Sequence, residues 1–78
     1  MLAELIEKMA KAIVHDPESV EVLKVWSDNS VILELVVAKE DYGRVIGKRG
    51  KLADAMRTIL AAASTHSRKR VILNIADK

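Results

Sequence analysis

The sequence predicts one α/β (α+β) domain with the order helix, strand, strand, short helix, helix, strand. Two observations support this order. Two long stretches carry apolar residues at helical spacing, and three others are rich in β-branched residues or alternate apolar with polar. The 78 residues are too few to hide a second domain, so we expect residues 1–78 to form a single core. Only Trp26 and Tyr42 are aromatic, and that core must therefore consist of aliphatic side chains and methionine.

The first element is an amphipathic helix at the start of the chain. Its apolar stripe consists of Leu2, Leu5, Ile6, Met9 and Ile13. The polar face mixes acids with bases instead of being basic, which favours packing on a core over attachment to a membrane surface. The helix should end near His15-Asp16-Pro17, because a residue before proline is disfavoured in the α conformation.

Two β-rich segments follow, Val20–Trp26 and Val31–Val37, and a turn sequence separates them. They predict an antiparallel hairpin. In the second segment Val31, Leu33, Leu35 and Val37 share one face, which we expect to meet the core. The first segment does not alternate cleanly, because its apolar residues change face after Val22, and a bulge would reconcile them.

The second half of the chain predicts two helices and a strand. Asp41 is a candidate cap for a short helix that ends at Gly47, although Gly43 weakens that helix. A longer helix begins after Gly50, with the apolar stripe Leu52, Ala55, Met56, Ile59, Leu60 and Ala63. Val71, Leu73 and Ile75 then alternate as a half-buried strand. The intervening helices allow this strand to lie parallel to Val31–Val37, with all helices on one face of the sheet.

The segment from Val45 to Gly50, with the sequence Val-Ile-Gly-Lys-Arg-Gly, joins the two helices of the second half. Glycines at 47 and 50 permit a sharp turn and a close approach of backbone to a ligand. The following helix start has amides without internal partners, and Lys48 and Arg49 add positive charge. Anions bind at such sites, and phosphate is the natural ligand. A purely structural alternative is a corner in which Gly47 caps one helix and Gly50 eases the start of the next.

This segment resembles the V-I-G-x-x-G signature of KH domains, which bind single-stranded RNA and DNA through a GXXG loop. The whole chain also resembles the KhpA family of small bacterial one-domain KH proteins. The longer eukaryotic-type consensus has a large aliphatic residue where this chain has Ala53, which favours the bacterial comparison. The resemblance implies the type II KH arrangement, α-β-β-α-α-β, with a three-stranded mixed sheet.

By this interpretation the candidate RNA-binding residues are Arg44, Val45, Gly47, Lys48, Arg49, Gly50 and Lys51. The glycines permit close approach, Lys48 and Arg49 contact phosphates, and the neighbouring cations extend the track, with Arg57 as a further member. Bases would lie in a groove between this corner and the sheet edge near Val31–Val37. Val45 is either groove floor or core, and Ile46 is expected in the core. One such module binds weakly, so pairing through a second domain is expected.

The resemblance further implies an RNA-chaperone or post-transcriptional role linked to cell elongation and envelope homeostasis. It implies pairing with the larger KhpB (Jag-type) RNA-binding protein, or a homodimer. The alternative is a protein interaction adaptor that uses the KH fold without significant nucleic-acid binding. No apolar run is long enough to cross a bilayer, no signal peptide pattern opens the chain and there is no cysteine, so we expect a cytoplasmic protein without a membrane partner.

Charge divides the chain into two halves. Residues 1–41 hold four lysines against nine acids, a net charge of −5, and residues 42–78 hold nine cations against two acids, a net charge of +7. Such polarity suggests a polyanion on one side, although charges also segregate on ordinary solvated surfaces. Arg68, Lys69 and Arg70 either reinforce RNA binding or protect an edge strand. Trp26 is either a core lid or a partner contact, and Tyr42 should pack beside the short helix.

Nothing in the sequence resembles an active site. His15 and His66 are isolated from carboxylates and from each other, so neither a metal site nor a general base is expected. Ser64, Thr65 and Ser67 lack an orienting acid and an oxyanion site. We expect no catalytic activity and no cofactor.

Overall fold

A computed structural model describes residues 2–65 and 69–78 of the chain. The helices and strands in chain order are α1 (Leu2–Ile13), β1 (Glu21–Trp26), β2 (Ser30–Val37), α2 (Tyr42–Ile46), α3 (Lys51–Ala63) and β3 (Arg70–Asp77). Short 3₁₀ turns lie at Pro17–Ser19, Lys39–Asp41 and Lys48–Gly50. The predicted order α-β-β-α-α-β is confirmed. Helix α1 ends ahead of Pro17, as expected from the proline rule.

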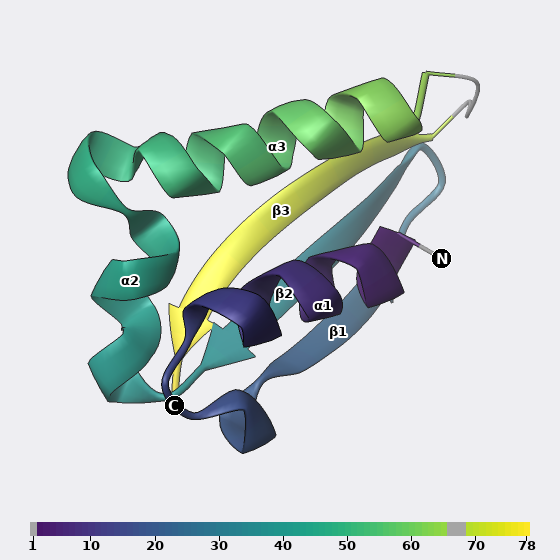
Figure 1. Cartoon of the computed structure of the whole chain (residues 1–78). Helices are drawn as coiled ribbons and strands as arrows, with labels where there is room; N and C mark the ends of the chain where they lie inside the picture. Colours follow the sequence, from purple (N-terminus) through teal and green to yellow (C-terminus); the bar gives the residue numbers. More distant parts are fainter. Residues whose placement is uncertain (1, 66–68) are drawn as a thin grey trace.

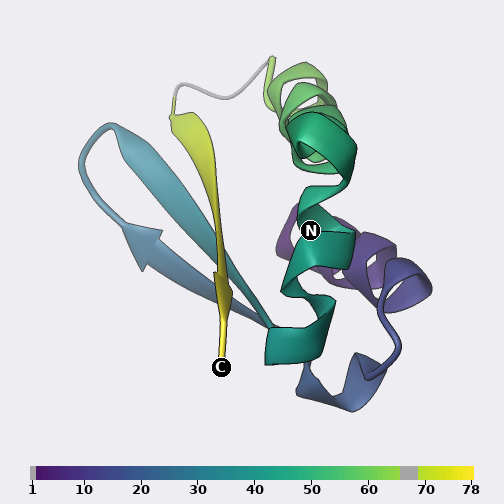
Figure 2. The ribbon, with the colours of Figure 1, turned by 90° about the vertical axis from the view of Figure 1, so that its left-hand side faces the viewer.

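The three strands form one mixed sheet in the order β1-β2-β3 (Figure 1). Strand β2 pairs antiparallel with β1 and parallel with β3, so the predicted hairpin and the predicted parallel return are both confirmed. The three α-helices lie on one side of the sheet and leave the other side bare (Figure 2). Helix α2 and the turn after it stand at one end of α3, and the hairpin loop lies toward the other end (Figure 1).

The core lies between the helices and the covered face of the sheet. Strand β2 alternates strictly, and its side chains at 31, 33, 35 and 37 are buried as the sequence predicts. They pack with buried residues of the three helices and β3, chiefly Ile6, Ala10, Val45, Met56, Leu60 and Leu73. Strand β3 is half-buried, with Leu73 the most deeply placed residue of its alternating set.

The first strand contains no bulge of the kind that would reconcile its apolar pattern. Pairing from Glu21↔Val36 to Trp26↔Val31 is continuous, so Val22 lies on the covered face with the core residues of β2. Leu23 and Val25 consequently point to the bare face, where both are exposed. The irregular apolar pattern of this strand therefore reflects two apolar side chains that stay on the surface, and not a bulge.

Candidate nucleic-acid interface

Gly47 makes the sharp turn between α2 and the residues that lead to α3. Its backbone has φ 79° and ψ 172°, a region that essentially only glycine occupies. A Cβ at this position would stand 2.7 Å from the Cβ of Leu52 and 2.9 Å from its backbone nitrogen. Both the conformation and the space require glycine here, and the amide of Gly47 still closes α2 by donating to the carbonyl of Gly43 at 3.0 Å.

The last two residues of the loop, Arg49 and Gly50, have left-handed backbone conformations. Arg49 has φ 58° and Gly50 has φ 75°, and the Gly50 amide donates to the Gly47 carbonyl at 3.1 Å. Arg49 is the one described residue other than glycine with a positive φ. A left-handed conformation costs such a residue about 1–2 kcal/mol. A Cβ at Gly50 would meet open space, so only the backbone conformation favours glycine at that position.

Three cations surround a hollow at this corner. Lys48, Arg49 and Lys51 are exposed and line a hollow of about 210 Å³. Among residues 2–65 and 69–78, no carboxylate lies within ion-pairing distance of any of them. No side chain caps the start of α3, so the positive end of its helix dipole faces the same corner, although the amide of Lys51 already donates to the carbonyl of Lys48. The arrangement is suited to an anion with several oxygen atoms.

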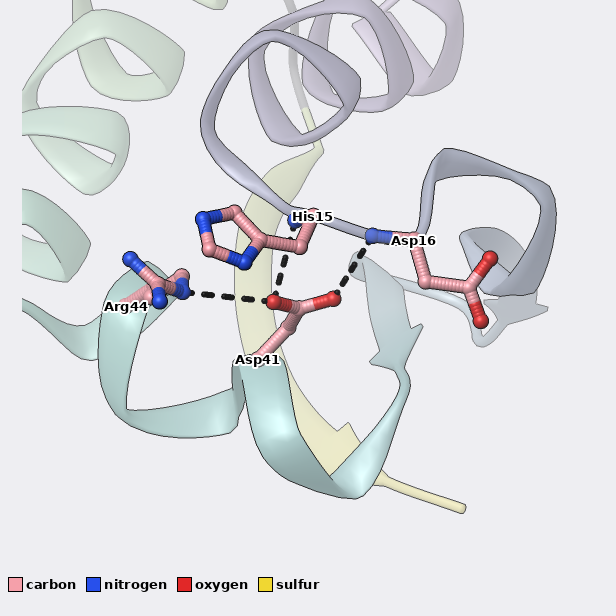
Figure 3. Close-up of polar contacts among 4 residues, drawn as sticks. All are labelled: His15, Asp16, Asp41 and Arg44. Carbon is pink, nitrogen blue, oxygen red and sulfur yellow. Dashed lines mark hydrogen bonds and ion pairs between the residues drawn. The ribbon is translucent and has the colours of Figure 1, made fainter.

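Arg44 belongs to the same side of the molecule but has an acidic partner. Its Nε lies 3.5 Å from Oδ1 of Asp41, which is almost fully buried (Figure 3). Asp41 also accepts hydrogen bonds at 3.0 Å from the backbone amides of His15 and Asp16, one to each carboxylate oxygen. The bond from His15 is the main cause that lowers the pKa of Asp41 below its ordinary value of 3.8, while burial opposes it. Asp41 therefore links the chain after α1 to the start of α2.

The expectation that Asp41 caps the short helix is wrong. Its side chain makes no capping bond to α2, because both carboxylate oxygens are taken by amides 25 and 26 residues earlier in the chain. The sequence carries no signal for this contact. Local spacing can indicate a cap, but it cannot indicate a partner that the fold brings from another element.

The apolar pair before the loop is split between core and surface. Val45 is fully buried in the core, and Ile46 is only partly buried. The expectation that Ile46 lies in the core is therefore wrong, and Val45 is the core residue of this pair. Because a side chain without exposed surface cannot touch a ligand, Val45 supports α2 from inside, and Ile46 is the residue available to a groove.

The family model for the KhpA/KhpB KH domain matches residues 3–75. The chain belongs to this family. Relatives named RNA-binding protein KhpA are 47% identical in Caldanaerobacter subterraneus subsp. tengcongensis and 46% identical in Clostridium acetobutylicum, covering 95% of this chain and 99% of theirs. A third, from Treponema pallidum, is 46% identical over 99% of this chain and 96% of its own.

A solved structure shows the same fold as this KhpA-family chain. It is Era in complex with MgGDPNP and nucleotides 1506–1542 of 16S ribosomal RNA. The TM-score is 0.59 at 21% identity, and the match covers 99% of this chain and 30% of that one. At this identity the comparison supports the KH-like architecture alone.

The sheet edge beside the loop is not the one that the sequence suggested. Strand β2 is central and flanked on both sides, so Val31–Val37 offers no free edge, and that expectation is wrong. The outer edge next to α3 belongs to β3. Arg57 of α3 bridges to it by donating from Nη2 to the carbonyl of Leu73 at 3.3 Å, while Nη1 lies 3.6 Å from Asp54. In this KhpA-family chain Arg57 therefore ties α3 to β3.

The other residues considered as RNA or partner contacts, Trp26, Lys69 and Arg70, lie toward the end of α3 that is far from the loop. Trp26 is 63% exposed, and the Lys69 ammonium lies 4.9 Å from the centre of its ring. Lys69 also donates to the carbonyl of Ser27 at 3.4 Å, so it engages the hairpin and not the GXXG loop. Arg70 begins β3 and is exposed. His66, Ser67 and Arg68, which the sequence analysis considered, lie outside the described residues.

Within residues 2–65 and 69–78, no helix is long and apolar enough to span a bilayer, and no group of three or more histidines or acids is placed to hold a metal ion.

Proposed function

We propose that this chain binds single-stranded RNA, and that the GXXG loop from Gly47 to Gly50 holds the sugar-phosphate backbone. The observation that carries the proposal is the loop itself: two exposed cations stand on a backbone turn that glycine permits, beside the uncapped start of α3. Three relatives of similar length carry the name RNA-binding protein KhpA, which supports RNA as the ligand.

In the proposed complex Lys48, Arg49 and Lys51 contact phosphates, and amides of the first turn of α3 beyond Lys51 donate to phosphate oxygens. Gly47 and Gly50 let the RNA backbone pass close to the protein backbone. Arg44 extends the positive track, although its ion pair with Asp41 weakens its charge toward a ligand. These contacts position a strand without reading its sequence.

Bases would lie along the side of α3 that faces the outer edge of β3. Ile46 is the partly exposed apolar residue nearest the loop in sequence. Trp26 lies toward the opposite end of α3, and Tyr42, at the start of α2, is the one aromatic residue of the described ranges on the loop side, so bases near the loop have no platform of several rings to stack on. We therefore expect weak binding with modest sequence preference, in contrast to readers that use a stacking platform.

The decisive experiment replaces both loop cations. In a low-salt titration with fluorescent single-stranded RNA, Lys48→Asp with Arg49→Asp should reduce affinity at least tenfold and leave the thermal unfolding transition in place. The matched control is Lys8→Glu with Lys39→Glu, which makes the same change in net charge at exposed sites away from the loop. If the two double variants bind equally well, the loop assignment is wrong.

The family membership supports a finer proposal about the cellular role. We propose a cytoplasmic RNA chaperone or post-transcriptional regulator that contributes to cell elongation and envelope homeostasis and has no catalytic activity. Because one small module binds weakly, a second RNA-binding module would raise avidity, and the KhpB (Jag-type) protein or a second copy of this chain would supply it. Co-purification with KhpB after nuclease treatment, together with the solution mass of the pure protein, tests which one pairs.

The alternative function is that of a protein adaptor that uses this fold without significant RNA binding. The bare apolar face of the sheet is the observation that favours a protein partner. An adaptor would retain its partner after nuclease treatment and would show negligible RNA affinity even at low salt. The titration with the loop variants separates the two functions.

A further inference from the structure

The face of the sheet that carries no helix is apolar. The strand registers place alternate residues of all three strands on it (Figure 2). Its apolar members are Leu23, Val25, Ile32, Val36, Ile72 and Ala76. We call these six residues, together with Glu34 and Asn74, the open sheet face, and Glu21, Ser30 and Arg70 lie on the same side at its ends. It belongs to the side of the sheet away from the helices that carry the GXXG loop.

The most exposed apolar side chains of this face lie on β1. Leu23 is 51% exposed and Val25 is 54% exposed, and Ile32, Val36, Ile72 and Ala76 are each partly exposed. Single exposed apolar residues are ordinary, but a contiguous apolar patch on one sheet face marks an interaction site. Covering it removes apolar surface from water, at about 25 cal/mol for each Å².

One carboxylate stands in the middle of this patch. Glu34 lies at the centre of β2, opposite Leu23 on one side and Asn74 on the other. It is partly buried, and it makes no ion pair or hydrogen bond with any residue in the described ranges 2–65 and 69–78. Leu23, Ile32 and Val36 flank this negative charge, so a complementary surface must be apolar and must carry a positive charge opposite Glu34.

A second copy of the chain fits this requirement poorly. In a symmetric pairing of the two open sheet faces, each Glu34 would stand close to the other near the centre of the interface. Two carboxylates taken out of water together repel each other and lose hydration. RNA fits poorly too, because its phosphates would meet this carboxylate at the centre of the face, while the cation Arg70 lies at its end.

We infer that the open sheet face docks a protein partner whose apolar surface carries a lysine or arginine opposite Glu34. Three strands about 4.8 Å apart and six residues of about 3.3 Å give a footprint of roughly 15 by 20 Å. This is smaller than the roughly 800 Å² that each partner of a stable complex buries, so the contact is transient. The partner occupies a face away from the loop, and protein and RNA can bind together.

The test uses a photo-crosslinking residue on the open sheet face. The full chain with p-benzoylphenylalanine at position 25 is expressed in its native host, irradiated and analysed for crosslinked peptides. The expected product joins position 25 to an apolar segment of another protein that contains a lysine or arginine. The control places the same residue at position 24, which projects from the opposite face of β1, and it should not give this product.

Charge reversal then tests the role of Glu34. Glu34→Lys should reduce the yield of this product at least fivefold, and replacing the partner's cation with glutamate should restore it. RNA affinity of Glu34→Lys should stay within threefold of the parent, which separates this inference from the RNA proposal. Four outcomes would each overturn the inference. They are crosslinks only to a second copy, crosslinks only to RNA, no crosslink at position 25, and a crosslink yield that neither charge change alters.

Discussion

At Gly47 the backbone conformation and the close approach of Leu52 disfavour every residue with a Cβ. Gly47→Ala should therefore destabilise the fold by roughly 1–3 kcal/mol, from the unfavourable conformation together with the contact at Leu52. Urea unfolding followed by circular dichroism measures this loss. Gly50→Ala is the control, because its Cβ meets open space and only a left-handed φ is disfavoured, at about 1 kcal/mol. Equal losses at the two positions would contradict the steric part of the argument.

The free energy of unfolding should depend on pH through the carboxyl group of Asp41. Its pKa is lower in the folded chain than its ordinary value of 3.8, so the charged form stabilises the fold. The stabilisation is complete above about pH 5 and disappears as pH falls through the lowered pKa. Asp41→Asn keeps the shape but points an NH₂ group at a backbone N–H, and it should melt at a lower temperature than the parent at neutral pH.

Thermal unfolding of the parent and Asp41→Asn over a pH series measures this dependence. The gap between their melting temperatures should be constant near neutral pH and should narrow toward acid pH. A gap that is unchanged down to pH 2 would show that the carboxylate charge is irrelevant to the contacts in Figure 3.

At the scale of the elements, the two faces of the sheet differ in burial, because the helices cover one face and leave the other bare. Leu33 on β2 is buried, and Leu23 on the neighbouring strand is half exposed on the other face. Leu33→Ala should cost about 2–5 kcal/mol because it leaves a cavity, and Leu23→Ala should cost less than about 1 kcal/mol. Chemical denaturation compares the two. Similar losses would mean that the open sheet face is covered within the folded chain.

Helix α2 cannot be stable on its own, because it has five residues and includes Gly43. Tertiary contacts fix its place. Val45 anchors it in the core, and Asp41 holds its start to the chain after α1. The orientation of the GXXG loop therefore depends on packing at residues that do not touch the proposed ligand.

For the whole molecule, the charge difference between its two halves predicts a strong effect of salt on RNA binding. Residues 42–78 form α2, the loop, α3 and β3, and carry a net charge of +7. If three or four cations neutralise phosphates, the slope of log K against log salt should lie between about −2 and −3. Lys48→Asp with Arg49→Asp should make this slope smaller in magnitude by about 1.4. Titration at several salt concentrations measures both slopes, and a slope near zero would exclude phosphate contacts.

Much of the fold and the loop could be predicted without the structure. The helical stripe of α1, the strict alternation of β2 and the glycines at 47 and 50 are local patterns, and local geometry decides what they form. The expectations that failed concern contacts across elements. The strand edge beside the loop is β3 instead of β2, the carboxylate of Asp41 binds a distant turn, and Val45 takes the core position that was expected of Ile46.

The sequence by itself determined the order of elements, the covered face of β2 and the position of a cationic GXXG turn ahead of a helix, because spacing and backbone preference are properties of neighbouring residues. Only the tertiary structure decided that Leu23 and Val25 stay exposed, that Glu34 has no ion-pair or hydrogen-bond partner among the described residues, and that Arg57 reaches the edge of β3. Those outcomes depend on which surfaces the helices cover when the sheet closes against them. That choice is made by packing between segments far apart in the chain, and no local pattern contains it.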